Sequence, residues 1–155
     1  MPLEIGFPAP DFNLQDETEV WRRLSDYRGR PVVLYFYPRD DTTGCTKEAC
    51  GFRDDYRGFQ QRDVTILGVS PDTPRSHAKF KNKFHLPFSL LADIDHKVAD
   101  LYGAWGRKKF AGREYDGILR TTFLLNSEGK VLHIFENVKP VEHSAEILGY
   151  LESVK

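Results

Sequence analysis

An unbroken apolar run at residues 31–37 is the strongest structural signal in the sequence. Its β-branched and aromatic side chains are typical of a central strand that is buried on both faces. Pro38 ends the run. Beyond it, apolar residues recur every three or four positions among charged ones: Ala49, Phe52, Tyr56 and Phe59. This spacing predicts a helix that begins near Cys45 and buries one face.

A second strand and helix follow in the same order. Residues 64–69 form another apolar run and predict a second buried strand. A helix is expected next, with Thr73 as its cap and Pro74 in its first position. His77 and His85 lie on or near this helix, where we interpret both as solvated surface residues without a chemical role.

Three shorter segments complete the first two thirds of the chain. Apolar residues at 12–14 and 20–21, with polar residues between them, predict an N-terminal hairpin. Asp95 is expected to cap a short helix that Gly103 ends. Residues 105–117 mix glycine with charged residues and show no periodicity, which favours a surface loop, either simply solvated or docking an acidic reductase.

The last third of the chain predicts a hairpin and a helix. Residues 121–125 and 130–135 have the pattern of strands, and residues 126–129 form a turn signal that makes the pair antiparallel. A final amphipathic helix is indicated by four apolar residues: Val141, Ala145, Leu148 and Leu151. The whole order of elements predicts an α/β domain whose mixed central sheet has helices on both faces.

Composition narrows the class of protein. A chain of 155 residues with 40% hydrophobic content fits one globular domain, and neither repeats nor low-complexity tracts divide it. With 22 basic and 23 acidic residues there is no cationic surplus for nucleic acid or an anionic membrane. The N-terminus lacks a signal-peptide pattern and no apolar run is long enough to cross a bilayer. We therefore expect a cytoplasmic protein, and a monomer.

Both cysteines of the chain lie in the predicted helix that follows the first buried strand. Cys45 is at its N-terminus, where unpaired backbone N–H groups favour a thiolate and lower a cysteine's pKa. Cys50 follows five residues later, a spacing that lacks the C-x-x-C pattern of zinc sites, and the histidines are scattered. A reactive, redox-cycling pair is favoured over a buried hydrophobic cysteine, a metal site or a structural disulfide.

The residues around Cys45 resemble a known active-site motif. Pro38, Thr42 and Cys45 match the P-x-x-x-T-x-x-C motif of peroxiredoxins, and the residues up to Asp54 are similar to the bacterioferritin comigratory protein branch, also called PrxQ. The likeness continues over nearly the whole chain, at residues 68–72, 86–88, 102–103, 105–106 and 120–123. It implies a thioredoxin fold, with the N-terminal hairpin as an extension, and a peroxidase that needs no cofactor or metal.

Each site residue has an expected role, which for Arg120 and Thr42 comes from the resemblance. Cys45 is expected to be the nucleophile that attacks a peroxide, and Arg120 the cation that stabilises its thiolate and the peroxide oxygen. Thr42 is expected to hydrogen-bond the peroxide and the sulfur, or to serve as a turn or cap residue. Pro38 is expected to shield the sulfur from water, and Glu48 to orient an arginine or satisfy the helix dipole.

Helix geometry sets a condition on the second step of such a reaction. A sulfenic acid on Cys45 needs a second thiol, and Cys50 is the candidate. Residues five apart on an ideal helix have Cα atoms roughly 8–9 Å apart, whereas a disulfide needs about 4.4–6.8 Å. The start of the helix must therefore unwind before the two sulfurs can bond, after which thioredoxin or a similar dithiol protein would restore the thiols.

Two other functions are compatible with the same fold. A thioredoxin-like disulfide exchange protein would reduce disulfides without peroxide, but such proteins normally use C-x-x-C. A binding or chaperone module without catalysis is also open, because a fold does not determine a function. Oxidation of a thioredoxin system that depends on peroxide separates the three hypotheses.

Overall fold

A seven-stranded mixed sheet lies at the centre of the computed structural model, which describes residues 3–154. Its strands are β1 (Asn13–Gln15), β2 (Trp21–Arg23), β3 (Val32–Phe36), β4 (Thr65–Ser70), β5 (Ser89–Ala92), β8 (Thr121–Leu125) and β9 (Val131–Phe135). Two further strands, β6 (Trp105–Phe110) and β7 (Arg113–Ile118), lie outside this sheet. The α-helices are α1 (Thr43–Asp54), α2 (Tyr56–Gln60), α3 (Pro74–Phe84), α4 (Lys97–Leu101) and α5 (His143–Ser153), and Leu24–Tyr27 forms a 3₁₀ turn.

The order of strands in the sheet is β2-β1-β5-β4-β3-β8-β9. β3, β4 and β5 pair in parallel, and the other neighbours are antiparallel. The predicted mixed sheet is confirmed, as are the N-terminal hairpin of β1 and β2 and the hairpin of β8 and β9. β3 lies inside the sheet, between β4 and β8, so its end is surrounded by neighbouring strands and loops.

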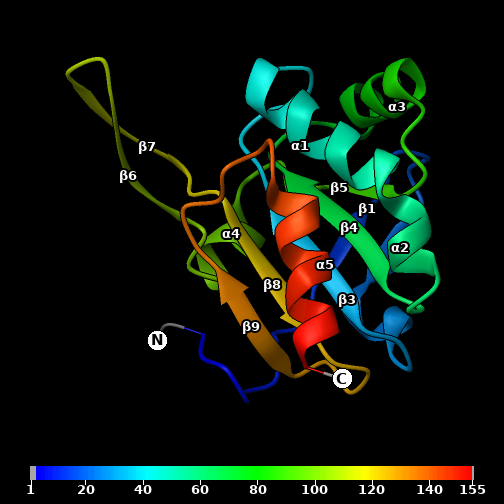
Figure 1. The fold of residues 1–155 in the computed structure, drawn as a ribbon. Helices are drawn as coiled ribbons and strands as arrows, with labels where there is room; N and C mark the ends of the chain where they lie inside the picture. Colours follow the sequence, from blue (N-terminus) through cyan, green and yellow to red (C-terminus); the bar gives the residue numbers. More distant parts are fainter. Residues whose placement is uncertain (1–2, 155) are drawn as a thin grey trace.

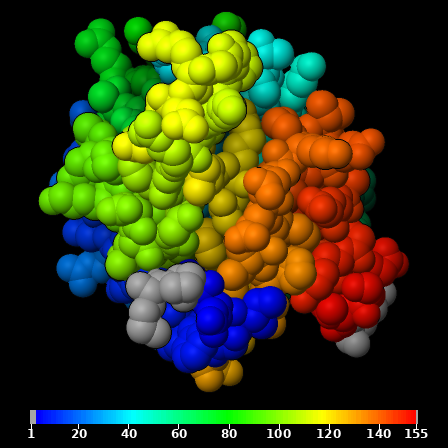
Figure 2. All heavy atoms as spheres, turned by 90° about the vertical axis from the view of Figure 1, so that its left-hand side faces the viewer, coloured from blue at the N-terminus to red at the C-terminus, as the bar shows by residue number. Residues whose placement is uncertain are grey.

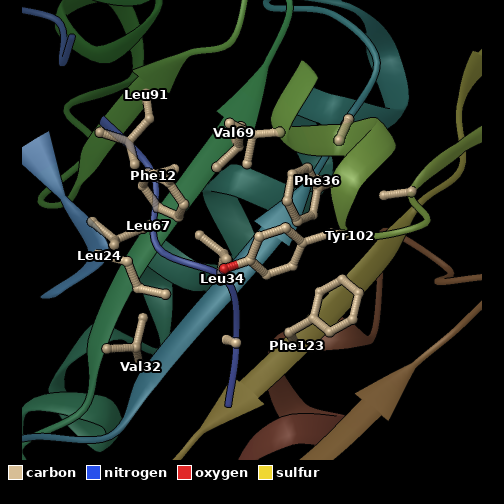
Figure 3. Close-up of a cluster of buried hydrophobic side chains, with 14 of the residues drawn as sticks. Phe12, Leu24, Val32, Leu34, Phe36, Leu67, Val69, Leu91, Tyr102 and Phe123 are labelled. Carbon is tan, nitrogen blue, oxygen red and sulfur yellow. The ribbon is translucent and has the colours of Figure 1, made fainter. Parts of the chain in front are cut away.

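Alternation along β3 explains how the sheet supports helices on both faces. Figure 1 shows α1, α2 and α5 on one face and α4 on the other. Phe80 of α3 packs in the same core as α1 and α5. This core also contains Val33 and Tyr35 of β3 and Tyr37, which follows the strand. The opposite core, drawn in Figure 3, contains the alternate residues of the strand: Val32, Leu34 and Phe36. All six are buried.

Residues 105–117 are not a loop, and that prediction is wrong. β6 and β7 pair over six residues each as a separate two-stranded hairpin. Figure 1 shows it extending away from the sheet, and Figure 2 shows its yellow-green to yellow residues on the outer surface. Both faces are largely exposed, so no alternation marks the strands. Ala111 and Gly112 make the turn, with positive φ angles of 52° and 79°. Such a turn usually has Asn in the first of these positions, so Ala111 is a weaker sequence signal for a hairpin.

The N-terminus of α4 is capped by a residue other than the one predicted. Asp93, which is 1% exposed, accepts hydrogen bonds from the backbone N–H groups of Val98 (3.1 Å) and Ala99 (2.8 Å). Asp95 is exposed and accepts only from Lys97, at 3.4 Å. The prediction was wrong because His96 takes the cap position with a φ of 51°, a turn that brings the earlier aspartate under the helix. Gly103 ends the helix as predicted, with a φ of 74°.

Two further predictions need correction. The predicted final helix is confirmed as α5, and Leu148 and Leu151 pack against the core as expected. Val141 instead precedes the helix, Ala145 is exposed, and the fully buried positions are His143, Ser144 and Ile147. The shift arises because polar side chains take core positions there. His77 of α3 is also buried rather than solvated, with no exposed surface, because its ring nitrogens both find hydrogen-bond partners inside the protein. His85 is exposed, as expected.

The cap of α4 provides a direct test. Asp93→Ala is expected to lower the free energy of unfolding by about 1–2 kcal/mol, because two backbone N–H groups lose their acceptor. Asp95→Ala, the matched control, should change it by less than about 0.5 kcal/mol, as exposed substitutions do. Urea denaturation measures both values, and equal losses for the two variants would contradict the assignment.

Candidate active site

Cys45 is the third residue of α1 and is 1% exposed. The chain leaves β3 at Phe36, crosses a loop of residues 38–42 that we call the active-site loop, and enters the helix at Thr42. The first intrahelical bond joins the Thr46 N–H to the Thr42 carbonyl at 2.8 Å. The N–H groups of the first turn therefore lie beside the sulfur without partners inside the helix, and they favour negative charge there.

Arg120 brings a positive charge to the sulfur from the other side. Its Nη2 donates to Cys45 Sγ at 3.1 Å, and its Nη1 donates to Glu48 Oε1 at 2.9 Å. Arg120 directly precedes β8, and its carbonyl accepts from the Val138 N–H at 3.2 Å. The structure thus brings together three of the predicted site residues, Cys45, Glu48 and Arg120.

Gly44 is a part of the site that the sequence reasoning missed. A Cβ atom at this position would lie 2.8 Å from Arg120 Nη2, a distance that real Cβ contacts do not reach. Any larger residue would push the guanidinium away from the sulfur. A glycine in the first turn of a helix, where it lowers helix stability, was the signal that could have identified it.

Glu48 is buried below the arginine, at 1% exposure. Burial raises the pKa of its carboxyl to about 7, and the Arg120 guanidinium acts in the opposite direction. Its second oxygen, Oε2, has no hydrogen-bond partner in the described structure. Glu48 therefore contacts one fork of the guanidinium while the other fork faces the sulfur.

Thr42 and Pro38 do not join this cluster through hydrogen bonds. The Thr42 hydroxyl donates to the Arg39 carbonyl at 2.9 Å, and Thr42 occupies the N-cap position of α1 without a side-chain capping bond. Thr42 is exposed at the start of the helix. Pro38 is half-buried immediately after Tyr37, at the entry to the active-site loop.

Cys50 lies on the same continuous helix as Cys45, and both are free thiols. Cys50 is half-buried, and burial raises the pKa of its thiol, with Asp54 acting in the same direction and Arg53 opposing it. Cys45 instead belongs to the core beneath the helix. An unbroken helix with the two sulfurs in different surroundings agrees with the geometric expectation that they do not bond in this conformation.

One group of described side chains has the composition of a metal site. Asp40, Asp72 and His77 offer ligand atoms that lie within 4.8 Å of one another. Each of the three already makes hydrogen bonds to protein groups, and neither cysteine is among them. The cluster joins Asp40 of the active-site loop to Asp72 and His77 behind it.

A buried cysteine in the first turn of a helix, with a guanidinium at its sulfur and a mixed sheet of this topology beneath it, defines a thiol peroxidase. The chain belongs to the AhpC/TSA family, whose model matches residues 5–134. It is similar over 154 residues, at 47% identity, to peroxiredoxin Bcp of Bacillus subtilis, covering 99% of this chain and 98% of that protein. Peroxiredoxin Bcp of Escherichia coli is 41% identical over 97% of each chain.

Solved structures confirm the thioredoxin-like peroxiredoxin fold. A variant of Xylella fastidiosa PrxQ superimposes with a TM-score of 0.92 at 30% identity, over 99% of this chain and 98% of that one. A Xanthomonas campestris structure described for its alkyl peroxide reduction activity has a TM-score of 0.88 at 32% identity, over 97% of this chain and 96% of that one. No helix among residues 3–154 is long and apolar enough to span a membrane.

The raised pKa of Glu48 predicts a pH-dependent stability. The folded protein holds this proton up to about pH 7, whereas the unfolded chain releases it near its ordinary value of 4.5. Stability from this group is fully present below pH 4.5 and is lost as the pH rises to about 7, by roughly 3 kcal/mol. Glu48→Gln is expected to remove that loss.

The measurement is the free energy of unfolding in urea between pH 4.5 and 7.5. The control is Glu152→Gln, at an exposed position of α5, which should keep the slope of the parent. If Glu48→Gln shows the same slope as the parent, Glu48 does not hold a proton in this range.

Proposed function

We propose that Cys45 is the peroxidatic nucleophile and that Arg120 is the group that activates it and binds the peroxide. The observation that carries this assignment is the Arg120 guanidinium shared between Cys45 Sγ (3.1 Å) and Glu48 Oε1 (2.9 Å). A guanidinium stays protonated at all working pH values and offers donors in a fixed plane. One edge can therefore stabilise both the thiolate and the oxygen that develops charge during attack.

The first step forms an S–O bond and breaks the O–O bond. The Cys45 thiolate attacks one peroxide oxygen, which becomes the sulfenic acid, and the other oxygen leaves as hydroxide or alkoxide and takes a proton to give water or an alcohol. In our proposal Thr42, which is exposed beside the helix start, contacts the peroxide, and Pro38 fixes the entry of the loop. Hydrogen peroxide and organic hydroperoxides are the proposed substrates.

The second step is resolution by Cys50. Its thiol condenses with the sulfenic acid, so an S–S bond forms and water is released. A dithiol protein such as thioredoxin then reduces the disulfide and restores both thiols. Because Cys45, Cys50 and Arg120 all belong to one chain, we assign the monomer as the working unit, and we place the cycle in the cytoplasm, where such reductants operate.

The test of the function is an assay that couples thioredoxin reductase, thioredoxin and a peroxide. The chain should oxidise thioredoxin only when peroxide is present, and Cys45→Ser should abolish this activity. Reduction of disulfides without peroxide would favour the exchange protein, and the absence of both reactions would favour a binding module.

Arg120→Ala is expected to slow the first oxidation by about 10²–10³-fold, because the site loses its preorganised donor to the developing charge. Stopped-flow measurement of the second-order rate with hydrogen peroxide gives the value. The control is Arg107→Ala on the exposed β6–β7 hairpin, which should keep the rate of the parent. Equal rates for Arg120→Ala and the parent would exclude the catalytic role.

Cys50→Ser is expected to keep the first step and lose the second. One equivalent of peroxide should give a sulfenic acid on Cys45 that a sulfenate reagent traps, while turnover with thioredoxin falls and over-oxidation occurs sooner. In the parent, residues 46–52 should lose amide protection against hydrogen exchange on oxidation, because the first turns of α1 unwind. A variant that recycles at the parent rate, or a disulfide within an unbroken helix, would contradict this mechanism.

A further inference from the structure

A buried polar cluster lies directly behind the active-site loop. Its centre is Asp40, a loop residue five positions before Cys45 that is 8% exposed. The Asp40 carboxylate accepts from the Tyr37 hydroxyl at 2.6 Å and from the Ser76 hydroxyl at 2.8 Å, and it contacts His77 Nδ1 at 2.7 Å. A side chain with this many short contacts holds its segment of backbone in one position.

The loop backbone is fixed at the same residue. The Asp40 N–H donates to Asp72 Oδ2 at 2.8 Å, and the same carboxylate oxygen accepts from the Ser70 hydroxyl at 2.6 Å. Asp72 follows β4, and Ser76 is on α3. The active-site loop is therefore held to two elements that do not contribute any residue to the chemistry at the sulfur.

His77 has a fixed orientation in this cluster. Its Nε2 lies 2.9 Å from the Leu91 carbonyl, which can only accept, so Nε2 carries a proton. Its Nδ1 lies 2.7 Å from Asp40 Oδ2, and two lone pairs at this distance would repel each other. A second proton therefore lies between these two atoms. His77 is completely buried, so water does not replace either partner. The imidazole thus forms a rigid link from β5 through α3 to the active-site loop.

This link acts on the segment that must move during resolution. The active-site loop runs into Thr42, the cap of α1, and the first turn of α1 must unwind before Cys50 reaches Cys45. We propose that His77 is a positioning residue which, through Asp40, holds the active-site loop closed and sets how readily the first turn of α1 opens. The inference rests on the proposed function, in which Cys50 resolves Cys45.

Two substitutions of His77 separate its two hydrogen bonds. The amide nitrogen of asparagine lies near the place of Nδ1, so His77→Asn keeps a donor toward Asp40 and loses the bond to Leu91. The longer glutamine places its amide nitrogen near Nε2, so His77→Gln keeps the donor toward the Leu91 carbonyl and loses the one toward Asp40. Both variants place a carboxamide at this buried position, so any general effect of replacing the imidazole by an amide is the same in the two proteins.

The first measurement is residue-resolved hydrogen exchange of the reduced, full-length protein without peroxide. The reporters are the amides of Asp40 and Thr46, which donate to Asp72 and to the Thr42 carbonyl. His77→Gln is expected to lower their protection by at least about tenfold, since a hydrogen bond to a charged group contributes that much. His77→Asn should stay close to the parent.

The second measurement follows Cys45 during turnover with peroxide and thioredoxin. Easier opening favours the disulfide over further oxidation, so His77→Gln should give less over-oxidised Cys45 per turnover than the parent, as measured by mass spectrometry. A purely structural role would lower the thermal stability of both His77 variants without changing this ratio. Because hydrogen exchange needs no peroxide, its outcome is independent of whether the proposed function holds.

Ser76→Ala keeps the inference testable if neither His77 variant folds. It removes one hydrogen bond to Asp40 from a half-buried position and should lower protection of the Asp40 and Thr46 amides by a smaller factor. The proposal is wrong if Ser76→Ala leaves these amides at parent protection. It is also wrong if the two folded His77 variants lose protection equally.

Discussion

The contact between the Arg120 guanidinium and the Cys45 sulfur is the constraint on which the arrangement of the site depends. The two residues are 75 positions apart in the chain, and they meet at 3.1 Å because β3 and β8 are adjacent in the sheet. α1 starts from the end of one strand, and Arg120 precedes the other. Gly44 lets the guanidinium approach, and Glu48 fixes its plane. One pair of neighbouring strands thus brings the guanidinium to the sulfur.

The same helix has to satisfy two opposing requirements. Its N-terminus must be formed for the N–H groups to lie beside the sulfur, and it must open for Cys50 to reach Cys45. Packing limits how far that opening extends, because Phe52 is fully buried. The centroid of its ring lies 4.8 Å from that of the Tyr35 ring and 5.8 Å from that of the Phe59 ring. Unwinding that reaches Phe52 therefore has to draw its ring out of the aromatic core, which makes Phe52 the limit of the segment expected to lose amide protection on oxidation.

The sequence was most informative where burial and chemistry coincide. The apolar run of β3 and the spacing on α1 predicted the position of Cys45, the first turn of that helix pointed to Glu48, and the resemblance supplied Arg120. Exposed or polar structure was harder to recognise: the β6–β7 hairpin buries neither face, so it has no alternation. His77 was misjudged for a related reason, since its burial depends on partners such as Asp40 and Leu91, which lie far away in the chain.

The β6–β7 hairpin has a consequence for the behaviour of the protein at high concentration. As a separate two-stranded ribbon it has two outer edges, each with backbone N–H and C=O groups free to pair with another chain, and Phe110 near its tip is 72% exposed. Exposed edges of this kind promote aggregation unless charge opposes it. Arg107, Lys109 and Arg113 lie on these strands and are exposed. Glu114 and Asp116 pair with Arg107 and offset part of this charge, and the cationic excess that is left on the ribbon disfavours edge-to-edge stacking of identical copies.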